Sequence, residues 1–296
     1  MVATKKKVTP APSKPVSRAV ATKPKNEVGN VDVKLLMKQD AGRGVSTAAE
    51  DNIIPLIYIL QSLSPVALKQ KPEYIKGAAA GMIWPRGTKT IIDGEEEGLP
   101  VIPVAFKKCW IEWRPNRGGF AGRYEYDAAS DDKGRPEGAE WVEDPKKKGR
   151  GAWELPNGNN VVETREHAVL ARINGNWNGA VISMSSTNHT ASRGWMGLMK
   201  DKRIPDSDDR APSYAYVYCL KTLARSNDDG DWYVWQAEDG MGDGEVTFVP
   251  DIDGGVELYK IARQLDRDFM SGAKQADAPV ESDSGTDGGK HDDDNL

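Results

Sequence analysis

Runs of β-branched and aromatic hydrophobic residues, some of them alternating with polar ones, predict β-strands along most of the chain. Two of these runs flank Asn174-Gly175, the pair of residues favoured in a two-residue hairpin turn. The predicted strands cover residues 99–113, 161–173, 177–184, 214–223 and 232–237. Because several strands follow one another with turns between them, the pattern predicts a mainly β fold, most simply a small antiparallel barrel with added helix and loops.

Two segments depart from this alternation and predict helices. Apolar residues recur at spacings of three and four over 256–270, which predicts an amphipathic C-terminal helix. A shorter helix is expected to begin near Pro55, with Asp51 or Asn52 as its N-cap, and to end at Pro65. Both helices would pack an apolar face against the barrel.

Charge is distributed unevenly between three parts of the chain. The first 25 residues contain seven Lys or Arg, four Pro and no acidic residue, whereas residues 271–296 contain seven acidic residues and two Lys. Neither end has enough apolar side chains to form a core, so we expect a disordered basic arm over 1–28 and a disordered acidic tail over 271–296. The domain between them, 29–270, would contain a mobile insertion at 127–160, which is rich in Gly, Asp, Glu and Lys.

Composition excludes several classes of protein. No apolar run approaches the roughly 18 residues that span a bilayer, so we expect no membrane contact and a cytoplasmic protein. With only Cys109 and Cys219, the chain can form neither a disulfide framework nor a Cys-based zinc site. The 40 basic and 45 acidic residues give a net charge of −5, so any site for a polyanion must be a local patch.

Motifs for catalysis or cofactor binding are not found. The spacing of Gly81, Gly87 and Lys89 does not match a phosphate-binding loop. His189 follows two serines, but there is no nucleophile elbow, which favours a polar surface turn over a catalytic triad. The Asp-rich turns at 228–231 and 251–254 lack the ligand spacing of a calcium loop. We therefore expect no enzyme activity, no cofactor and no metal.

Aromatic and basic residues occur together in the sequence. The chain has 9 Trp and 9 Tyr but 4 Phe, and in 110–114 alternation places Trp110 and Trp113 on opposite faces, so one of them should face outward. Aromatic rings on a β surface stack unpaired bases, at about 1–3 kcal/mol per base, while Arg and Lys bind phosphates. The rings predicted to stack are Trp110, Trp113, Phe120, Tyr124 and Trp195. The cations predicted to bind phosphates are Arg114, Arg117, Arg123, Arg193, Lys200 and Arg203. For each ring, burial in the core is the alternative.

Four segments resemble a group of tailed-phage replication and recombination proteins associated with single-stranded DNA. They read IPLIYILQSLSP (54–65), GLPVIPVAFKKCWIEW (98–113), AVISMSSTNHTASRGW (180–195) and YVYCLKTLARSNDDGDWYVW (216–235). The ending, Asp292, Asp293, Asp294, Asn295 and Leu296, is similar to the acidic tails of single-stranded-DNA-binding proteins, although those tails commonly end in Phe. The resemblance implies an OB-like barrel (the oligonucleotide/oligosaccharide-binding fold), a location in the host cytoplasm, and replication partners such as a polymerase or helicase that contact Asp292, Asp293, Asp294 and Leu296.

The sequence therefore predicts a non-enzymatic protein that binds single-stranded DNA and supports phage DNA replication, recombination or repair, as a monomer or a homo-oligomer. We also expect the acidic tail to compete with DNA for a basic groove. Three alternatives stay open. They are a strand-annealing recombination protein, a protein-binding or structural phage component, and a nuclease whose carboxylates converge from distant positions.

Overall fold

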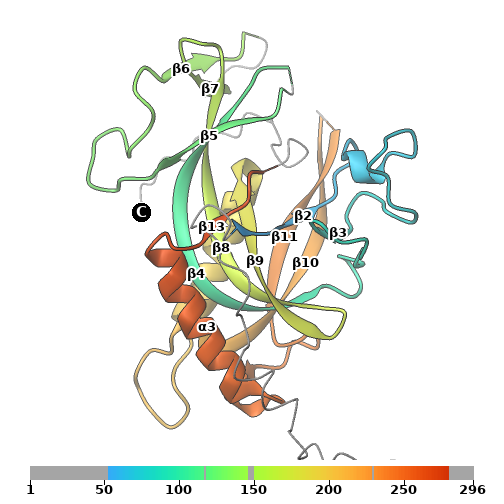
Figure 1. The fold of residues 1–296 in the computed structure, drawn as a ribbon, viewed down its shortest axis with the longest axis vertical. Helices are drawn as coiled ribbons and strands as arrows, with labels where there is room; N and C mark the ends of the chain where they lie inside the picture. The colour runs from blue at the N-terminus through green and yellow to red at the C-terminus, as the bar shows by residue number, and fades with distance from the viewer. Residues whose placement is uncertain (1–52, 117, 146–149, 229, 280–296) are drawn as a thin grey trace, which may run out of the picture. The chain divides into compact units, whose positions relative to one another are not determined.

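The computed structural model describes residues 53–279, except 117, 146–149 and 229. The predicted basic arm, Arg117 and the tail residues Asp292, Asp293, Asp294 and Leu296 therefore lie outside the described residues. In the described part the fold is mainly β, with a strongly curled, OB-like half-barrel sheet and a C-terminal helix (Figure 1). The predicted fold class is confirmed.

The main sheet has eleven strands in the described residues, with the order β11-β10-β4-β8-β9-β2-β3 along its path. Long antiparallel ladders join β4 to β8 and β8 to β9, and β2 pairs with β9 in parallel. The central strands are β2 (Leu56–Ile59), β3 (Ile83–Pro85), β4 (Leu99–Trp113), β8 (Asn160–Ile173), β9 (Asn176–Ser185), β10 (Tyr216–Asn227) and β11 (Gly230–Asp239). Shorter strands at the margins are β5 (Phe120–Glu125), β6 (Glu140–Glu143), β7 (Gly151–Glu154) and β12 (Thr247–Phe248).

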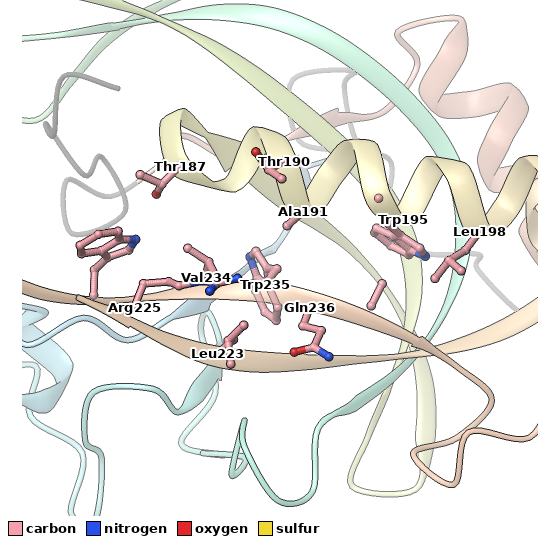
Figure 2. Close-up of a pocket in the computed structure, with 13 residues that line it drawn as sticks. Thr187, Thr190, Ala191, Trp195, Leu198, Leu223, Arg225, Val234, Trp235 and Gln236 are labelled. Atoms are coloured by element: carbon pink, nitrogen blue, oxygen red, sulfur yellow. The ribbon is translucent and has the colours of Figure 1, made fainter. Parts of the chain in front are cut away.

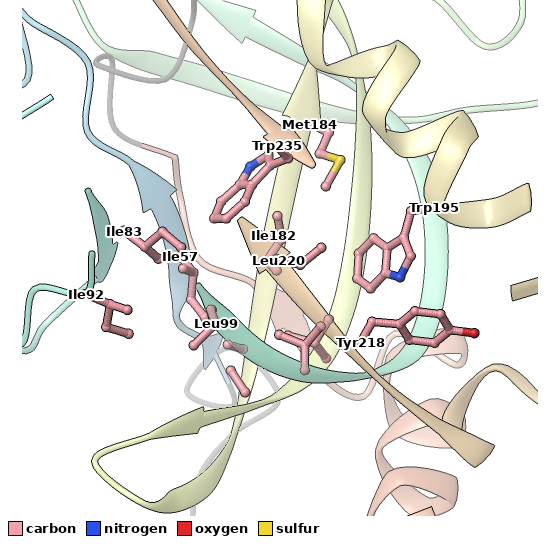
Figure 3. Close-up of a cluster of buried hydrophobic side chains, with 14 of the residues drawn as sticks. Ile57, Ile83, Ile92, Leu99, Ile182, Met184, Trp195, Tyr218, Leu220 and Trp235 are labelled. Atoms are coloured by element: carbon pink, nitrogen blue, oxygen red, sulfur yellow. The ribbon is translucent and has the colours of Figure 1, made fainter. Parts of the chain in front are cut away.

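Residues of alternating parity along each central strand form two hydrophobic cores, one on each side of the sheet. Leu99 of β4 lies in the core that contains Trp195 of α2 (His189–Lys200), as Figure 3 shows, and Val101 belongs to the same core. Ile102 and Val104 lie in the other core, which α3 (Gly255–Met270) covers. The sheet is therefore covered by one helix on each face, as the period of two in its strands requires.

The predicted strands and the hairpin turn are confirmed. Asn174 and Gly175 have φ of 50° and 79°, the left-handed pair that a tight two-residue turn between right-twisted strands needs. The helix predicted over 256–270 is α3. Its buried apolar residues are Ala262, Leu265 and Phe269, whereas Ile261 is exposed.

The helix predicted from Pro55 to Pro65 is wrong. Leu56–Ile59 form β2, and a short 3-10 helix, η2 (Pro65–Ala67), follows. All four residues of β2 are buried, because α3 covers one face of the strand and the core that contains Trp195 covers the other. A strand that is buried on both faces loses the alternation that would identify it.

Two predicted boundaries also change. The insertion predicted at 127–160 contains the β6–β7 hairpin, and β7 pairs with β8. The tail boundary predicted at residue 271 falls too early, because β13 (Gln275–Ala276) pairs in parallel with β1 (Ile53–Ile54) and Pro279 is buried. Within the described residues, the C-terminal segment 271–279 is thus part of the folded domain.

Side chains cap the outer edge of β11, the last strand of the sheet. The Gln61 amide donates to the carbonyl of Tyr233 (2.9 Å) and accepts from its N–H (2.9 Å). The side-chain oxygen Oδ1 of Asn188 accepts a hydrogen bond from the N–H of Trp235 (2.9 Å). An edge strand with satisfied backbone groups is a poor template for pairing with another chain. These contacts also hold β11 beside the 3-10 helix η3 (Ser186–Asn188) that precedes α2.

Candidate functional site

The two tryptophans of β4 that were predicted to bind bases are core residues. Trp110 and Trp113 are 3% and 7% exposed. The Trp110 ring stacks on Tyr126 (6.2 Å between centroids) and its Nε1 donates to the Lys133 carbonyl (3.0 Å). Trp113 packs edge-on against Phe120 (6.5 Å). The expectation that one of these tryptophans faces outward is wrong, because the segment containing Tyr126 and Lys133 covers one face of β4 and Phe120 covers the other.

Cations near these rings also contact the protein itself. The Arg135 guanidinium lies over the ring of Trp153 (3.3 Å to the centroid) and that of Trp110 (5.2 Å), and the Lys108 ammonium lies over Tyr126 (4.6 Å). Such cation–π contacts stabilise a fold by about 0.5–2 kcal/mol each. The aromatic and basic pattern of this part of the sequence therefore reports internal packing.

Arg123 is not available for a phosphate either. Its Nη2 pairs with the buried Glu166 carboxylate (2.9 Å), and its two terminal nitrogens donate to the carbonyls of Ala276 (2.8 Å) and Asp277 (3.1 Å). Burial raises the pKa of Glu166, and the positive charge of Arg123 opposes that shift. Arg123 therefore links β5 to the core of the sheet and to the C-terminal segment.

The remaining predicted residues on β5 and its turn have structural partners. The Tyr124 hydroxyl donates to Glu112, which also accepts from the amides of Asn157 and Asn159. Burial acts to raise the pKa of Glu112, but these hydrogen bonds, led by that of Tyr124, hold the pKa below its ordinary value. Arg114 is exposed and donates to the Phe120 carbonyl (2.6 Å).

The other predicted residues belong to α2 and the loop after it. Trp195 is 1% exposed and lies between His167 (4.8 Å) and Tyr218 (6.2 Å). Arg203 caps the end of the helix, since its Nη1 donates to the carbonyls of Lys200 (3.2 Å) and Lys202 (3.3 Å). Arg193 and Lys200 are exposed. Arg193 and Lys200 are therefore the predicted phosphate ligands of this region that present their charge to solvent. Arg203, by contrast, has a structural role.

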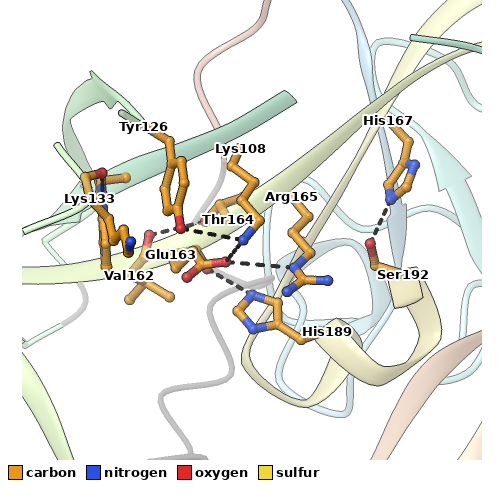
Figure 4. Close-up of polar contacts among 11 residues, drawn as sticks. Lys108, Tyr126, Lys133, Val162, Glu163, Thr164, Arg165, His167, His189 and Ser192 are labelled. Atoms are coloured by element: carbon orange, nitrogen blue, oxygen red, sulfur yellow. Dashed lines mark hydrogen bonds and ion pairs between the residues drawn. The ribbon is translucent and has the colours of Figure 1, made fainter. Parts of the chain in front are cut away.

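His167 is buried beside α2, and the half-buried His189 is the first residue of α2 (Figure 4). His167 Nε2 bonds with the Ser192 hydroxyl (2.9 Å), and burial lowers the pKa of His167 to about 3. His189 Nε2 bonds with the Glu163 carbonyl (3.0 Å), and burial lowers the pKa of His189 to about 4. The serine–histidine contact is thus not the one weighed from the sequence, and Ser192 is 0% exposed. A hydroxyl that no substrate reaches cannot act as a nucleophile.

A groove of about 670 Å³ lies between α2 and the β10–β11 hairpin (Figure 2). Its walls are mainly apolar, and among the described residues that line it Arg225 is the one charged side chain. The lining residues are Thr187, Thr190, Ala191, Gly194, Trp195, Leu198, Leu223, Arg225, Trp232, Val234, Trp235, Gln236 and Ala237. Three of the nine tryptophans of the chain meet here.

Two of the tryptophans that line the groove have an N–H without a partner. The Nε1 atoms of Trp195 and Trp232 are buried and have no hydrogen-bond partner within the described residues. An unsatisfied buried donor costs about 1–3 kcal/mol, so these two N–H groups reduce the stability of the fold around the groove. Arg225 lies directly opposite Trp232 in the β10–β11 register. Arg193 stands at the rim, where its Nη2 contacts the Thr190 hydroxyl (3.4 Å).

Of this groove, the sequence predicted only Trp195 and Arg193. Trp232, Trp235 and Arg225 were missed, although Arg225 and Trp232 lie at equal distances from the predicted turn at 227–230. Equal distance from a hairpin turn makes two residues cross-strand neighbours, which is a usable signal. The helix that forms the opposite wall was read as a polar turn and loop.

The described residues contain neither a cluster of metal-binding side chains nor a membrane-spanning helix. No group of three or more His, Cys, Asp or Glu side chains is placed to hold a metal ion in this part of the chain. In the same residues, no helix is both long and apolar enough to cross a bilayer.

Comparison with known proteins matches the chain to a protein family. The model of a family described as Pam3 phage gp34-like protein matches residues 26–275, well over half of the chain. No curated protein and no solved structure matches.

Proposed function

The chain belongs to the family of Pam3 phage gp34-like proteins, and we propose from the geometry of the groove between α2 and the β10–β11 hairpin that this phage protein binds single-stranded DNA there, without catalysis. The binding surface is therefore not the one predicted on β4 and β5. Arg193 is retained from that prediction, and the half-buried ring of Trp232 and the exposed Arg225 replace the remaining residues, whereas Trp195 (1% exposed) and Trp235 (4% exposed) line the groove as core residues.

The observation that carries the proposal is the combination of groups in one groove. The half-buried indole of Trp232 offers a ring face on which a flat base can stack, whereas the Nε1 atoms of Trp195 and Trp232 are covered by protein and donate to no ligand. Arg225 and Arg193 add positive charge at the wall and the rim. A single strand of DNA supplies flat bases and negative charge together, whereas a duplex hides its base faces.

A titration with labelled oligo-dT tests the proposal. Trp232→Ala should weaken binding about 5- to 150-fold, the equivalent of 1–3 kcal/mol for one stacked base. Arg225→Gln should weaken binding and reduce the slope of log affinity against log salt by about 0.7, the value for one phosphate contact to a single strand. Duplex DNA of the same length should bind more weakly.

Arg114→Gln is the matched control, because it removes an equally exposed charge from the end of β4, away from the groove residues. Its affinity for oligo-dT should equal that of the unmodified protein. If Arg114→Gln and Arg225→Gln weakened binding equally, or if oligo-dT did not bind, the groove would not be a DNA site.

One rival is favoured by a specific observation. Because the groove is lined mainly by apolar groups, it also fits an apolar segment of a partner protein, as the alternative of a protein-binding component proposes. The same titration separates the two, since a protein groove would not discriminate single strands from duplex. Recruitment of replication partners by the acidic tail and assembly into oligomers are further parts of the proposal.

A further inference from the structure

A second, smaller cavity of about 210 Å³ lies near the C-terminal end of α2. Helix residues Thr190, Ala191, Gly194, Trp195 and Leu198 line the large groove, whereas Met196, Met199 and Lys200 line the small cavity. The two therefore lie on different sides of one helix, separated by roughly its 10 Å diameter. A polymer bound in the groove would have to cross only α2 to reach the cavity.

A β-bulge helps to shape the inner wall of the cavity. The register of β4 against β8 shifts between Pro103 and Ala105, both of which line the cavity. Pro103 has no N–H to donate, so the ladder is interrupted there. Bulges of this kind often occur beside binding sites, because they change where neighbouring side chains point.

The cavity combines an aromatic wall with adaptable apolar side chains. Phe106 is half-buried, and its ring contacts His167 (4.9 Å between centroids), which in turn contacts Trp195 of the groove (4.8 Å). Met196 and Met199 face the same space. Phenyl and thioether groups together favour a flat, polarizable ligand.

Two cations stand at the cavity. Lys200 and Arg210 both line it and both are exposed, and no ion pair joins either of them to a described carboxylate. Nearby charges are mixed, since Asp201 follows Lys200 and Asp209 precedes Arg210. A ligand here would therefore need more than charge, and the apolar walls supply the second requirement.

We propose that this cavity holds one nucleotide of the bound strand, with its base against Phe106, Met196 and Met199 and its phosphate beside Lys200 and Arg210. The inference rests on the proposed function, because it extends the path of the same strand past α2. At this cavity, one base of the bound strand would leave the groove and be enclosed.

NMR of the full chain labelled with ¹³C at the methionine methyl groups tests this directly. Thymidine 5′-monophosphate at millimolar concentrations should shift the Met196 and Met199 signals, which are assigned with Met196→Leu and Met199→Leu. Arg210→Gln and Lys200→Gln should each weaken this binding roughly fivefold, the loss expected for one exposed charge pair. Arg114→Gln is the matched control and should leave this binding unchanged, because Arg114 is exposed and lines neither the groove nor the cavity.

The proposal fails if neither methyl signal responds to the nucleotide, if inorganic phosphate alone gives the same shifts, or if the Arg210 and Lys200 variants bind like the unmodified protein. A titration with oligo-dT separates this failure from that of the DNA groove. Oligo-dT that binds without moving Met196 or Met199 overturns the cavity alone. If thymidine monophosphate binds and oligo-dT does not, the groove fails and the cavity stands.

Discussion

His167 and His189 should make the protein lose stability at mildly acidic pH. His167 is buried and His189 is half-buried, and burial lowers their pKa values to about 3 and about 4 from an ordinary value of 6.5, so both are neutral in the fold. In the unfolded chain each binds a proton as pH falls below 6.5, whereas in the fold neither does until pH 4 or lower. The contribution of the two histidines to the free energy of unfolding is therefore most favourable above pH 6.5, and it decreases progressively as pH falls.

The size of the effect follows from the two pKa values. Each pH unit below 6.5 costs about 1.36 kcal/mol per histidine, so lowering pH from 7.5 to 5.0 should reduce the free energy of unfolding by about 2 kcal/mol each, or about 4 kcal/mol together. Glu166 acts in the opposite direction, because burial raises its pKa and protonation stabilises its folded form. The net loss is expected to stay clearly measurable.

Urea unfolding followed by tryptophan emission at several pH values measures this loss. His167→Phe combined with Ser192→Ala removes the imidazole and its hydroxyl partner together, and should reduce the pH-dependent loss by about 2 kcal/mol. Ser192→Ala alone is the control, because it keeps the titrating ring and should keep the loss. A free energy of unfolding that does not fall between pH 7.5 and 5.0, or falls equally in the double variant, would refute the reasoning.

Four further changes follow from the contacts described above. Trp113→Ala should destabilise the protein by about 3–5 kcal/mol, as expected for a buried aromatic side chain, and not simply weaken DNA binding; thermal unfolding measures this. Arg123→Ala leaves Glu166 buried without its partner and should cost about 3–5 kcal/mol, with faster proteolysis of the segment 271–279. Gly255→Ala should destabilise by about 1–3 kcal/mol in urea unfolding although alanine favours helices, because its Cβ would clash with the Val249 carbonyl oxygen. Removal of 280–296 should tighten oligo-dT binding at low salt if the acidic tail competes for the groove, and an unchanged affinity at low and high salt would exclude that competition.

The sequence predicted those strands and turns that a short stretch of residues identifies by itself. β4 was predicted from a run of β-branched and aromatic residues and β10 from alternation, and Asn174-Gly175 defines the turn between β8 and β9 without help from the rest of the chain. β2 was lost because its burial on both faces removed the alternation. α2 was lost because it contains Gly194 and Gly197, which disfavour helices, and its formation depends on packing against β11.

The site was harder to predict because exposure is a property of the whole fold. Trp110 has the same neighbours in sequence whether or not the segment containing Tyr126 and Lys133 folds over it. The groove joins α2 to β11, whose residues are separated by many others in sequence, and neither wall is a binding surface alone. A single chain indicates that aromatic rings are abundant, but not which of them other segments leave uncovered.

The pairing of β1 with β13 has a consequence for how the protein is made. Ile54 lies near the start of the described residues and its partner Ala276 near their end, so the contact requires almost the whole domain to have emerged from the ribosome. Closing so long a loop costs entropy before any contact stabilises it, which slows folding. During translation β1 therefore stays unpaired until β13 has been made. A chain that ended before Ala276 would lack the C-terminal partner of Ile54 and of Arg123, and would leave the ribosome with β1 unpaired.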